Sequence, residues 1–233
     1  GKKLNWVCSA TRARTVKEET LRAWKESGCV HVNSGIESAS EKMLEVMDKV
    51  TSVQDNLNML LTCNKVDVFT GLTLLVGMPG ESDETIDETI DNLSKALPDN
   101  FDWPFDMAIN YFQAVPGTPG YEYARAVGMI GDSIEAEEHY IENIYNVDAN
   151  ELGHYLNFTD LETEELAYWR NYIMLELVTA YMRKHGILRT LLHKDIPRYR
   201  YAAVYMLLPR PARRFLLRYL DVVRFFWTAG LFR

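Results

Sequence analysis

Cysteine is scarce in this sequence, and several short motifs of common enzymes are missing from it. The three cysteines, Cys8, Cys29 and Cys63, lie 21 and 34 residues apart, and such unrelated spacings argue against a disulfide framework and against secretion. The sequence also has no phosphate-binding loop, no nucleophile elbow, no glycine fingerprint of a dinucleotide fold and no His-x-x-x-His pair. We therefore expect a cytoplasmic protein outside these enzyme classes.

Long apolar runs are absent as well, and acidic residues are rare in the last part of the chain. No run of 18 or more uncharged apolar residues occurs, so we expect no membrane-spanning helix. Residues 1–180 hold 13 Lys and Arg against 31 Asp and Glu, a balance of −18, whereas residues 181–233 hold 12 against 2, a balance of +10. The two parts are expected to meet different partners, or each other.

What the chain does have is enough apolar sequence for a core and an alternation of strand and helix patterns. It is 47% hydrophobic and 12% aromatic. Four apolar, β-rich segments predict strands at 4–10, 30–34, 68–76 and 105–115. Between them, capping residues and apolar periodicity predict helices at 16–27, 40–47, 52–65 and 82–96.

This alternation predicts parallel βαβ units, hence an α/β fold. From about residue 133 the strand signal disappears and the sequence reads as helices. We therefore expect one unit at 1–132 and a helical region at 133–233 with a basic tail.

Two of the predicted strands end in small, polar, glycine-containing turns. The first turn is Gly35-Ile36-Glu37-Ser38, and the second is Gly77-Met78-Pro79-Gly80-Glu81. Open α/β sheets and barrels bind their ligands at such strand ends. The sequence therefore predicts a ligand-binding edge.

Six features in order resemble the radical S-adenosylmethionine (SAM) superfamily, in the branch where a cobalamin-binding domain precedes the radical SAM barrel. They are Arg12, the strand after Gly28, the two turns just named, Met47 with Lys49, and the turn Pro116-Gly117-Thr118-Pro119. The resemblance covers roughly residues 4 to 131. It implies strands three to six of a partial (β/α)6 barrel of the TIM type.

The resemblance lacks one major element. The family holds a [4Fe-4S] cluster with a CxxxCxxC motif after its first barrel strand, and this chain has no such motif. The chain therefore resembles the C-terminal part of a longer enzyme, with the cluster ligands and the cobalamin domain upstream of Gly1.

The resemblance also implies which residues bind SAM. Glu37 would accept hydrogen bonds from the ribose diol, although an acid here could equally favour the start of the next helix. Ser34 and Ser38 share this strand end, and either could simply satisfy local backbone groups. Arg12 could clamp the SAM carboxylate or remain a solvated arginine. Gly77, Pro79 and Gly80 would lie beside the adenine, and Glu81 could cap the next helix or touch ligand.

The activity implied is that of a cobalamin-dependent radical SAM enzyme, a methyltransferase or a cyclase, which is inactive without its upstream part. A methylthiotransferase-like radical SAM enzyme is one alternative. A non-catalytic scaffold that has lost its cluster is another. The substrate would be a small molecule, and the apolar, basic tail makes a lipid-like one attractive. Nucleic acid is not expected, because the acidic part would repel phosphates.

The tail predicts an amphipathic helix over residues 211–227. At 100° per residue, Arg213, Arg214 and Arg218 share a stripe with Asp221 and Arg224, and apolar residues occupy the rest. Such a helix could lie at the inner face of a membrane. Alternatively, it packs on the barrel or on the upstream domain, and its arginines pair with the acidic first part.

Overall fold

Four parallel strands form the only sheet in the part of the chain that this computed structural model describes. The structure describes all residues except 1–3, 104–105, 145–155, 195–196 and 220–233. The strands are hydrogen-bonded in chain order: β1 (Trp6–Thr11), β2 (Cys29–Glu37), β3 (Leu72–Val76) and β4 (Met107–Tyr111). All three pairings are parallel. The predicted α/β fold is therefore confirmed, and β3 is shorter than the predicted segment 68–76.

Helices connect the strands as a βαβ pattern requires. They are α1 (Glu18–Ser27), α2 (Glu41–Val46), α3 (Val53–Val66) and α4 (Asp83–Leu93). The left-handed residue Gly28 ends α1, and Ser52 with Asp55 forms a capping box at the start of α3. Both boundary signals are readable in the sequence.

The strands bury one face and leave the other partly open. In β3 the residues Leu72, Leu74 and Val76 are buried, whereas Thr73 and Leu75 are only half-buried. The buried face packs against α3 and α4 in the main core. The half-buried face is the one that would line the interior of a barrel.

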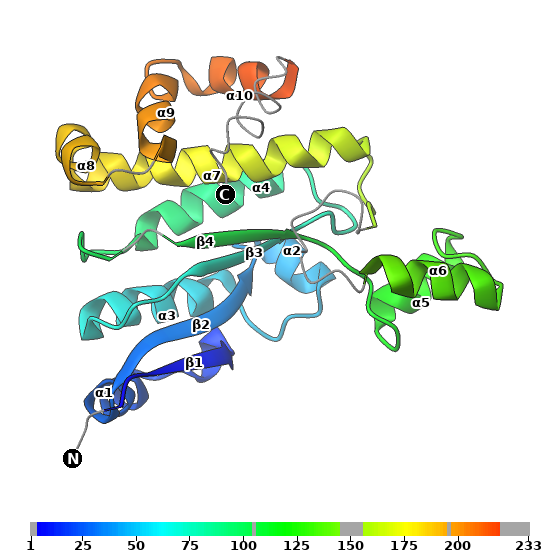
Figure 1. The fold of residues 1–233 in the computed structure, drawn as a ribbon, viewed down its shortest axis with the longest axis horizontal. Helices are drawn as coiled ribbons and strands as arrows, with labels where there is room; N and C mark the ends of the chain where they lie inside the picture. The colour runs from blue at the N-terminus through cyan, green and yellow to red at the C-terminus, as the bar shows by residue number, and fades with distance from the viewer. Residues whose placement is uncertain (1–3, 104–105, 145–155, 195–196, 220–233) are drawn as a thin grey trace.

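The later part of the helical region packs on this sheet rather than apart from it. It consists of α7 (Thr163–His185), α8 (Ile187–His193), α9 (Pro197–Tyr205) and α10 (Arg210–Tyr219), with α7 next to α4 (Figure 1). Trp169 of α7 is buried and donates to Asp83 Oδ1 at 2.7 Å. The core joins residues of β2, β3 and β4 with residues of α7, α9 and α10. This core thus contains residues from both sides of residue 132, and the division of the chain there stays a prediction.

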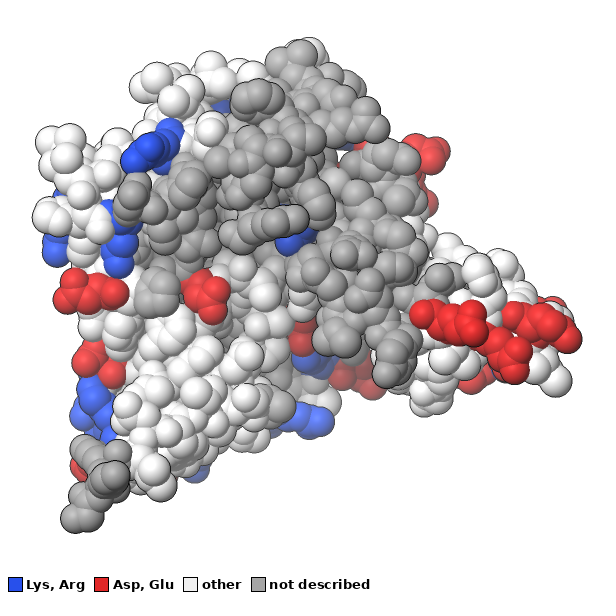
Figure 2. All heavy atoms as spheres, viewed as in Figure 1, with Lys and Arg blue, Asp and Glu red and all other residues white. Residues whose placement is uncertain are grey.

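Two helices before α7 project away from the sheet. They are α5 (Pro119–Ala126) and α6 (Ile134–Ile144). A small separate cluster holds them together, in which Tyr121 is buried and its hydroxyl donates to Glu137. In Figure 2, acidic side chains gather on this projection.

The basic tail is oriented differently from the amphipathic prediction. Arg213 is buried, and its guanidinium bonds both oxygens of Glu176 on α7 at 2.8 and 3.0 Å. Phe215, expected on the apolar side, is 61% exposed. Arginines of α10 thus face the protein, as in the alternative that has them pair with the acidic first part. Residues 220–227 of the predicted helix lie outside the described residues.

The acidic helix α4 explains this orientation. Its aspartates at 83, 87 and 91 follow a four-residue spacing that matches Arg210, Arg214 and Arg218 on α10. Arg210 bonds Asp91 at 3.0 Å and Asp87 at 3.1 Å. Such matched rows form a network of charges, which holds a helix in place better than isolated surface pairs. Within the described residues, no helix is both long and apolar enough to cross a bilayer.

Candidate functional site at the carboxyl ends of the strands

A cavity of about 670 Å³ lies where β2, β3 and β4 end. This is a size typical of small-molecule sites, and it lies at the edge of a parallel sheet where such sites occur. Its wall contains polar groups, namely Glu37, Asp48, Lys49, Asn110, Gln113 and Thr118. It also contains apolar and aromatic groups, namely Val46, Met47, Leu75, Met78, Pro79, Tyr111, Phe112, Val115, Pro119, Tyr123 and Phe158.

Two residues of this wall, Glu37 and Asp48, have an unusual backbone, and the φ of Asp48 is 50°. Glu37 is the one that ends a strand. Its φ is 59°, in the left-handed region that a non-glycine residue rarely adopts. Its carboxylate pairs with Lys49 Nζ at 3.2 Å and lies back over Gly35. Strained residues of this kind gather at binding sites. The carboxylate of Glu37 thus pairs with another residue of the cavity wall, Lys49. This contact favours a role in the cavity over the alternative in which Glu37 stabilises the start of the next helix.

Gly35 makes room for this carboxylate. A Cβ added at Gly35 would lie 2.3 Å from Glu37 Oε1, so a methyl group must push the flexible side chain aside. We predict that Gly35→Ala leaves the free energy of unfolding within about 1 kcal/mol of the wild type but weakens ligand binding at Glu37. Urea unfolding and ligand titration on the same variant check this. Equal ligand affinity would contradict the assignment of Glu37 to the site.

The second turn is held by a buried acid. Glu81 Oε2 accepts hydrogen bonds from the backbone N–H of Gly77 at 2.7 Å and of Met78 at 3.3 Å. Gly77 and Gly80 have φ of 101° and 74°, which glycine adopts without strain. Glu81 therefore holds the turn through its backbone N–H groups. Met78 and Pro79 of the same turn line the cavity.

Burial raises the pKa of Glu81 from 4.5 to about 7, against the opposing effect of its two backbone hydrogen bonds. The folded protein thus keeps this proton at pH values where the unfolded chain has lost it. We predict that the free energy of unfolding falls as the pH rises from about 4.5 to about 7. Glu81→Gln, which stays neutral, should remove this part of the pH dependence.

Urea unfolding across that pH range, with Glu88→Gln on the exposed side of α4 as control, isolates the contribution of Glu81. Wild-type and Glu81→Gln curves that run parallel would contradict the prediction.

The other predicted binding residues do not line the cavity. Ser34 Oγ donates to the carbonyl of Thr11 at 2.9 Å. Ser38 Oγ lies 3.0 Å from Thr89 Oγ1. Both serines are buried, so they fulfil the local role that the sequence left open. Arg12 is exposed and begins a short 3-10 helix. Their part in ligand binding stays a prediction.

Gly77 and Gly80 act through the backbone. The carbonyl of Gly80 accepts a hydrogen bond from Lys42 Nζ at 2.7 Å, which ties the turn to α2. Of the seven predicted residues, Glu37 and Pro79 are thus the two that line the cavity.

Sequence reasoning missed an aromatic end of the cavity. The Phe112 and Phe158 ring centroids lie 5.4 Å apart, as do those of Tyr123 and Phe158. Segment 156–158 reaches them because Phe158 N–H donates to the carbonyl of Gly77 at 3.2 Å. No local motif marks such a long-range contact. Lys49 was among the residues that carry the family resemblance, but the sequence did not predict its ion pair with Glu37.

Comparison with known proteins identifies the relatives of this site. Residues 1–93 match the family model of the radical SAM superfamily. This part of the chain, which contains Glu37 and the turn at 77–81, is therefore similar to that superfamily.

Curated relatives match about half of the chain. An uncharacterized methyltransferase of Pyrococcus horikoshii is 32% identical over 130 residues, which are 56% of this chain and 27% of that protein. An anaerobic magnesium-protoporphyrin IX monomethyl ester cyclase of Cereibacter sphaeroides is 32% identical over 103 residues, which are 43% of this chain and 17% of that protein. The match thus spans about a quarter or less of these relatives.

Among solved structures, the apo form of OxsB, a cobalamin-dependent S-adenosylmethionine radical enzyme, matches 99% of this chain and 37% of its own. The sequence identity is 13% and the TM-score is 0.50. At this identity the likeness shows the fold alone: parallel strands followed by a helical C-terminal region.

Proposed function

We propose that this chain is the SAM-binding part of a cobalamin-dependent radical SAM enzyme. The reaction would be a radical methylation at an unactivated carbon, or a related rearrangement or cyclisation. The observation that carries the proposal is the cavity at the strand ends, with a strained carboxylate, Glu37, in its wall. The related methyltransferase and cyclase support the reaction class.

The residues of the cavity fit SAM. Glu37 offers a carboxylate for two hydroxyl donors, and Gly35 leaves it the space to turn toward them. Lys49, 3.2 Å from Glu37, offers a cation for a ligand carboxylate. The turn at Met78 and Pro79 brings backbone and an apolar side chain to the same cavity, as a flat heterocycle requires.

These residues bind and orient; the cofactors carry the reaction itself. When bound beside a reduced iron–sulfur cluster, SAM would supply the chemistry for hydrogen-atom abstraction from the substrate. The part of this chain is to hold the ribose through Glu37 and to keep the turn at 77–81 in shape through Glu81. The apolar wall at Phe112 and Phe158 keeps water away from one end of the cavity.

The cluster itself does not fit the described residues. Among them, no group of three or more His, Cys, Asp or Glu side chains could hold a metal ion. Cys29 and Cys63 are buried in the core, and burial raises the pKa of Cys63 to about 12, so its thiol stays protonated. We therefore assign cluster and cobalamin to a longer protein that contains this chain.

The test is anaerobic reconstitution of that longer protein with iron, sulfide and cobalamin, followed by an assay for 5′-deoxyadenosine from SAM under reducing conditions. We expect 5′-deoxyadenosine from the reconstituted protein and none from this chain alone. A protein that assembles its cluster but leaves SAM intact would contradict the proposal.

A further inference from the structure

The charges in the wall of the strand-end cavity lie in one part of it. Among the described residues, the charged side chains of this wall are Glu37, Asp48 and Lys49, which all come from residues 37–49. The part of the wall that later residues form is uncharged. It consists of Asn110, Tyr111, Phe112, Gln113, Val115, Thr118, Pro119, Gly120, Tyr123 and Phe158. Because SAM is a charged molecule, the charged part suits SAM, and the uncharged part is left for a ligand without charge.

Three aromatic rings form the aromatic end of this uncharged part. Phe112 follows β4, Tyr123 lies on α5, and Phe158 precedes α7. The centroid of the Phe158 ring lies 5.4 Å from those of the other two rings. Two backbone hydrogen bonds fix this arrangement, from Leu156 N–H to the carbonyl of Phe112 at 3.3 Å and from Phe158 N–H to the carbonyl of Gly77 at 3.2 Å. The aromatic end is thus joined to the turn that lines the same cavity.

These rings stay accessible to a ligand. Tyr123 is 50% exposed, and Phe112 and Phe158 are half-buried. Aromatic rings attract other flat rings through offset or edge-to-face contacts, at centroid distances of about 4.5–7 Å. A flat, uncharged group in the cavity would gain such contacts, and it would leave no buried charge without a partner.

Gly120 sets the position of one of these rings. A Cβ added at Gly120 would lie 2.6 Å from Phe112 Cζ, closer than two unbonded carbon atoms can approach. Gly120 lies in α5, where alanine would otherwise be the better helix former. Both residues line the cavity. Any side chain at position 120 must therefore displace the rigid Phe112 ring and change the shape of the aromatic end.

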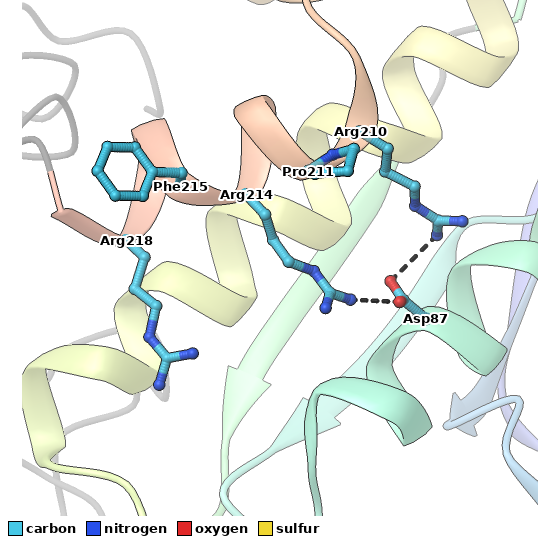
Figure 3. A pocket seen from close by; sticks show the side chains of 6 residues that line it. All are labelled: Asp87, Arg210, Pro211, Arg214, Phe215 and Arg218. Atoms are coloured by element: carbon cyan, nitrogen blue, oxygen red, sulfur yellow. Dashed lines mark hydrogen bonds and ion pairs between the residues drawn. The ribbon is translucent and has the colours of Figure 1, made fainter.

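A second pocket, of about 340 Å³ between α4 and α10, shows how different the strand-end cavity is. Figure 3 shows the guanidinium groups of Arg210 and Arg214 directed toward Asp87, with which both form ion pairs. Arg218, which also lines this pocket, pairs with Glu165. The protein itself neutralises these arginines, so this pocket offers a ligand neither free charge nor a set of aromatic rings.

We propose that the aromatic end of the strand-end cavity receives the substrate, and that the substrate presents an uncharged, flat, conjugated group to it. This inference rests on the proposed function, because it needs SAM at the charged part of the same cavity. Asn110 of β4 lies in the cavity wall and offers an amide to a polar atom of this group. The substrate class thus differs from the lipid-like molecule that the basic tail made attractive.

The test is fluorescence titration of this chain with N-phenyl-1-naphthylamine, a flat, uncharged probe that fluoresces in apolar surroundings, with and without saturating SAM. We expect binding in both cases, because the two ligands occupy different parts of the cavity. Tyr123→Ser and Gly120→Ala should each weaken probe binding about three- to tenfold, since the first removes one ring and the second displaces another. Unlabelled 2-naphthol should compete with the probe about tenfold better than decahydro-2-naphthol, which is not flat.

Val127→Ser is the matched control, since Val127 directly follows α5, is 48% exposed and does not line the cavity. It should bind the probe like the wild type. Circular dichroism and urea unfolding of all variants show whether the fold is kept. Tyr123 is half exposed, so Tyr123→Ser keeps the test decisive even where Gly120→Ala lowers the urea midpoint.

The possible failures of this inference and of the proposed function differ. Absence of probe binding, unchanged binding by Tyr123→Ser, or equal competition by the two naphthol compounds would overturn the inference. Displacement of the probe by SAM would also overturn it, because the aromatic end would then belong to SAM, and the proposed function would stand. Probe binding that Tyr123→Ser weakens, in a chain to which SAM does not bind in titration calorimetry, would instead contradict the proposed function and leave the ligand class of the aromatic end in place.

Discussion

Replacing Glu37 by glycine is expected to lower the affinity for SAM about 10- to 100-fold, the cost of losing charge-assisted hydrogen bonds. The same change should leave the fold as stable as before or make it more stable, because glycine adopts a φ of 59° without strain. Titration calorimetry with SAM and urea unfolding measure the two effects. A loss of function combined with unchanged or higher stability is the mark of a residue strained for binding.

Asp67→Gly is the matched control for this prediction. Asp67 has a φ of 58° at the end of α3 and does not line the cavity, so its replacement relieves the same strain away from the site. We expect Asp67→Gly to bind SAM like the wild type. If Glu37→Gly bound SAM as tightly as Asp67→Gly, Glu37 would not be a SAM-binding residue.

Replacing Glu176 by alanine is expected to cost about 3–5 kcal/mol of folding stability, because it leaves a buried guanidinium without its partner. Glu176 bonds Arg213 through both oxygens and also accepts from the hydroxyl of Tyr205 at 3.0 Å. Both charged side chains are less than 10% exposed. The cluster joins α7, α9 and α10, so its loss should loosen the outer helices. Urea unfolding measures the cost.

Glu165→Ala is the comparison. Glu165 pairs with Arg218 at 3.0 Å, but these side chains are 32% and 25% exposed. Partial exposure screens such a pair, and we expect a loss of about 1 kcal/mol or less. If Glu165→Ala and Glu176→Ala lowered the free energy of unfolding by similar amounts, burial would not determine how much the Arg213–Glu176 ion pair contributes to stability.

Several helix boundaries and one strand-end turn were predictable because their signals are local. Gly28 marks a helix end and Ser52 a helix start, and the turn at 77–81 needs glycines where φ is positive. Each of these follows from a few neighbouring residues. The order of the strands then follows from the rules of parallel sheets.

The orientation of α10 was not predictable in the same way. Its period of 3.6 residues is visible in the sequence, but that period gives two faces and does not say which one is buried. The aspartates of α4 decide it, more than 100 residues away in the sequence. The pairing of Lys49 with Glu37 and the approach of Phe158 to Phe112 likewise arise only from the folded chain.

The most direct test of the central claim is ultraviolet crosslinking of labelled SAM to this chain, followed by peptide mapping. We predict label within residues 37–49, 77–81 or 110–113, and its loss when excess unlabelled SAM competes or when Glu37 is replaced by glycine. Label confined to other segments, or label that unlabelled SAM does not displace, would contradict the assignment of the strand-end cavity to SAM.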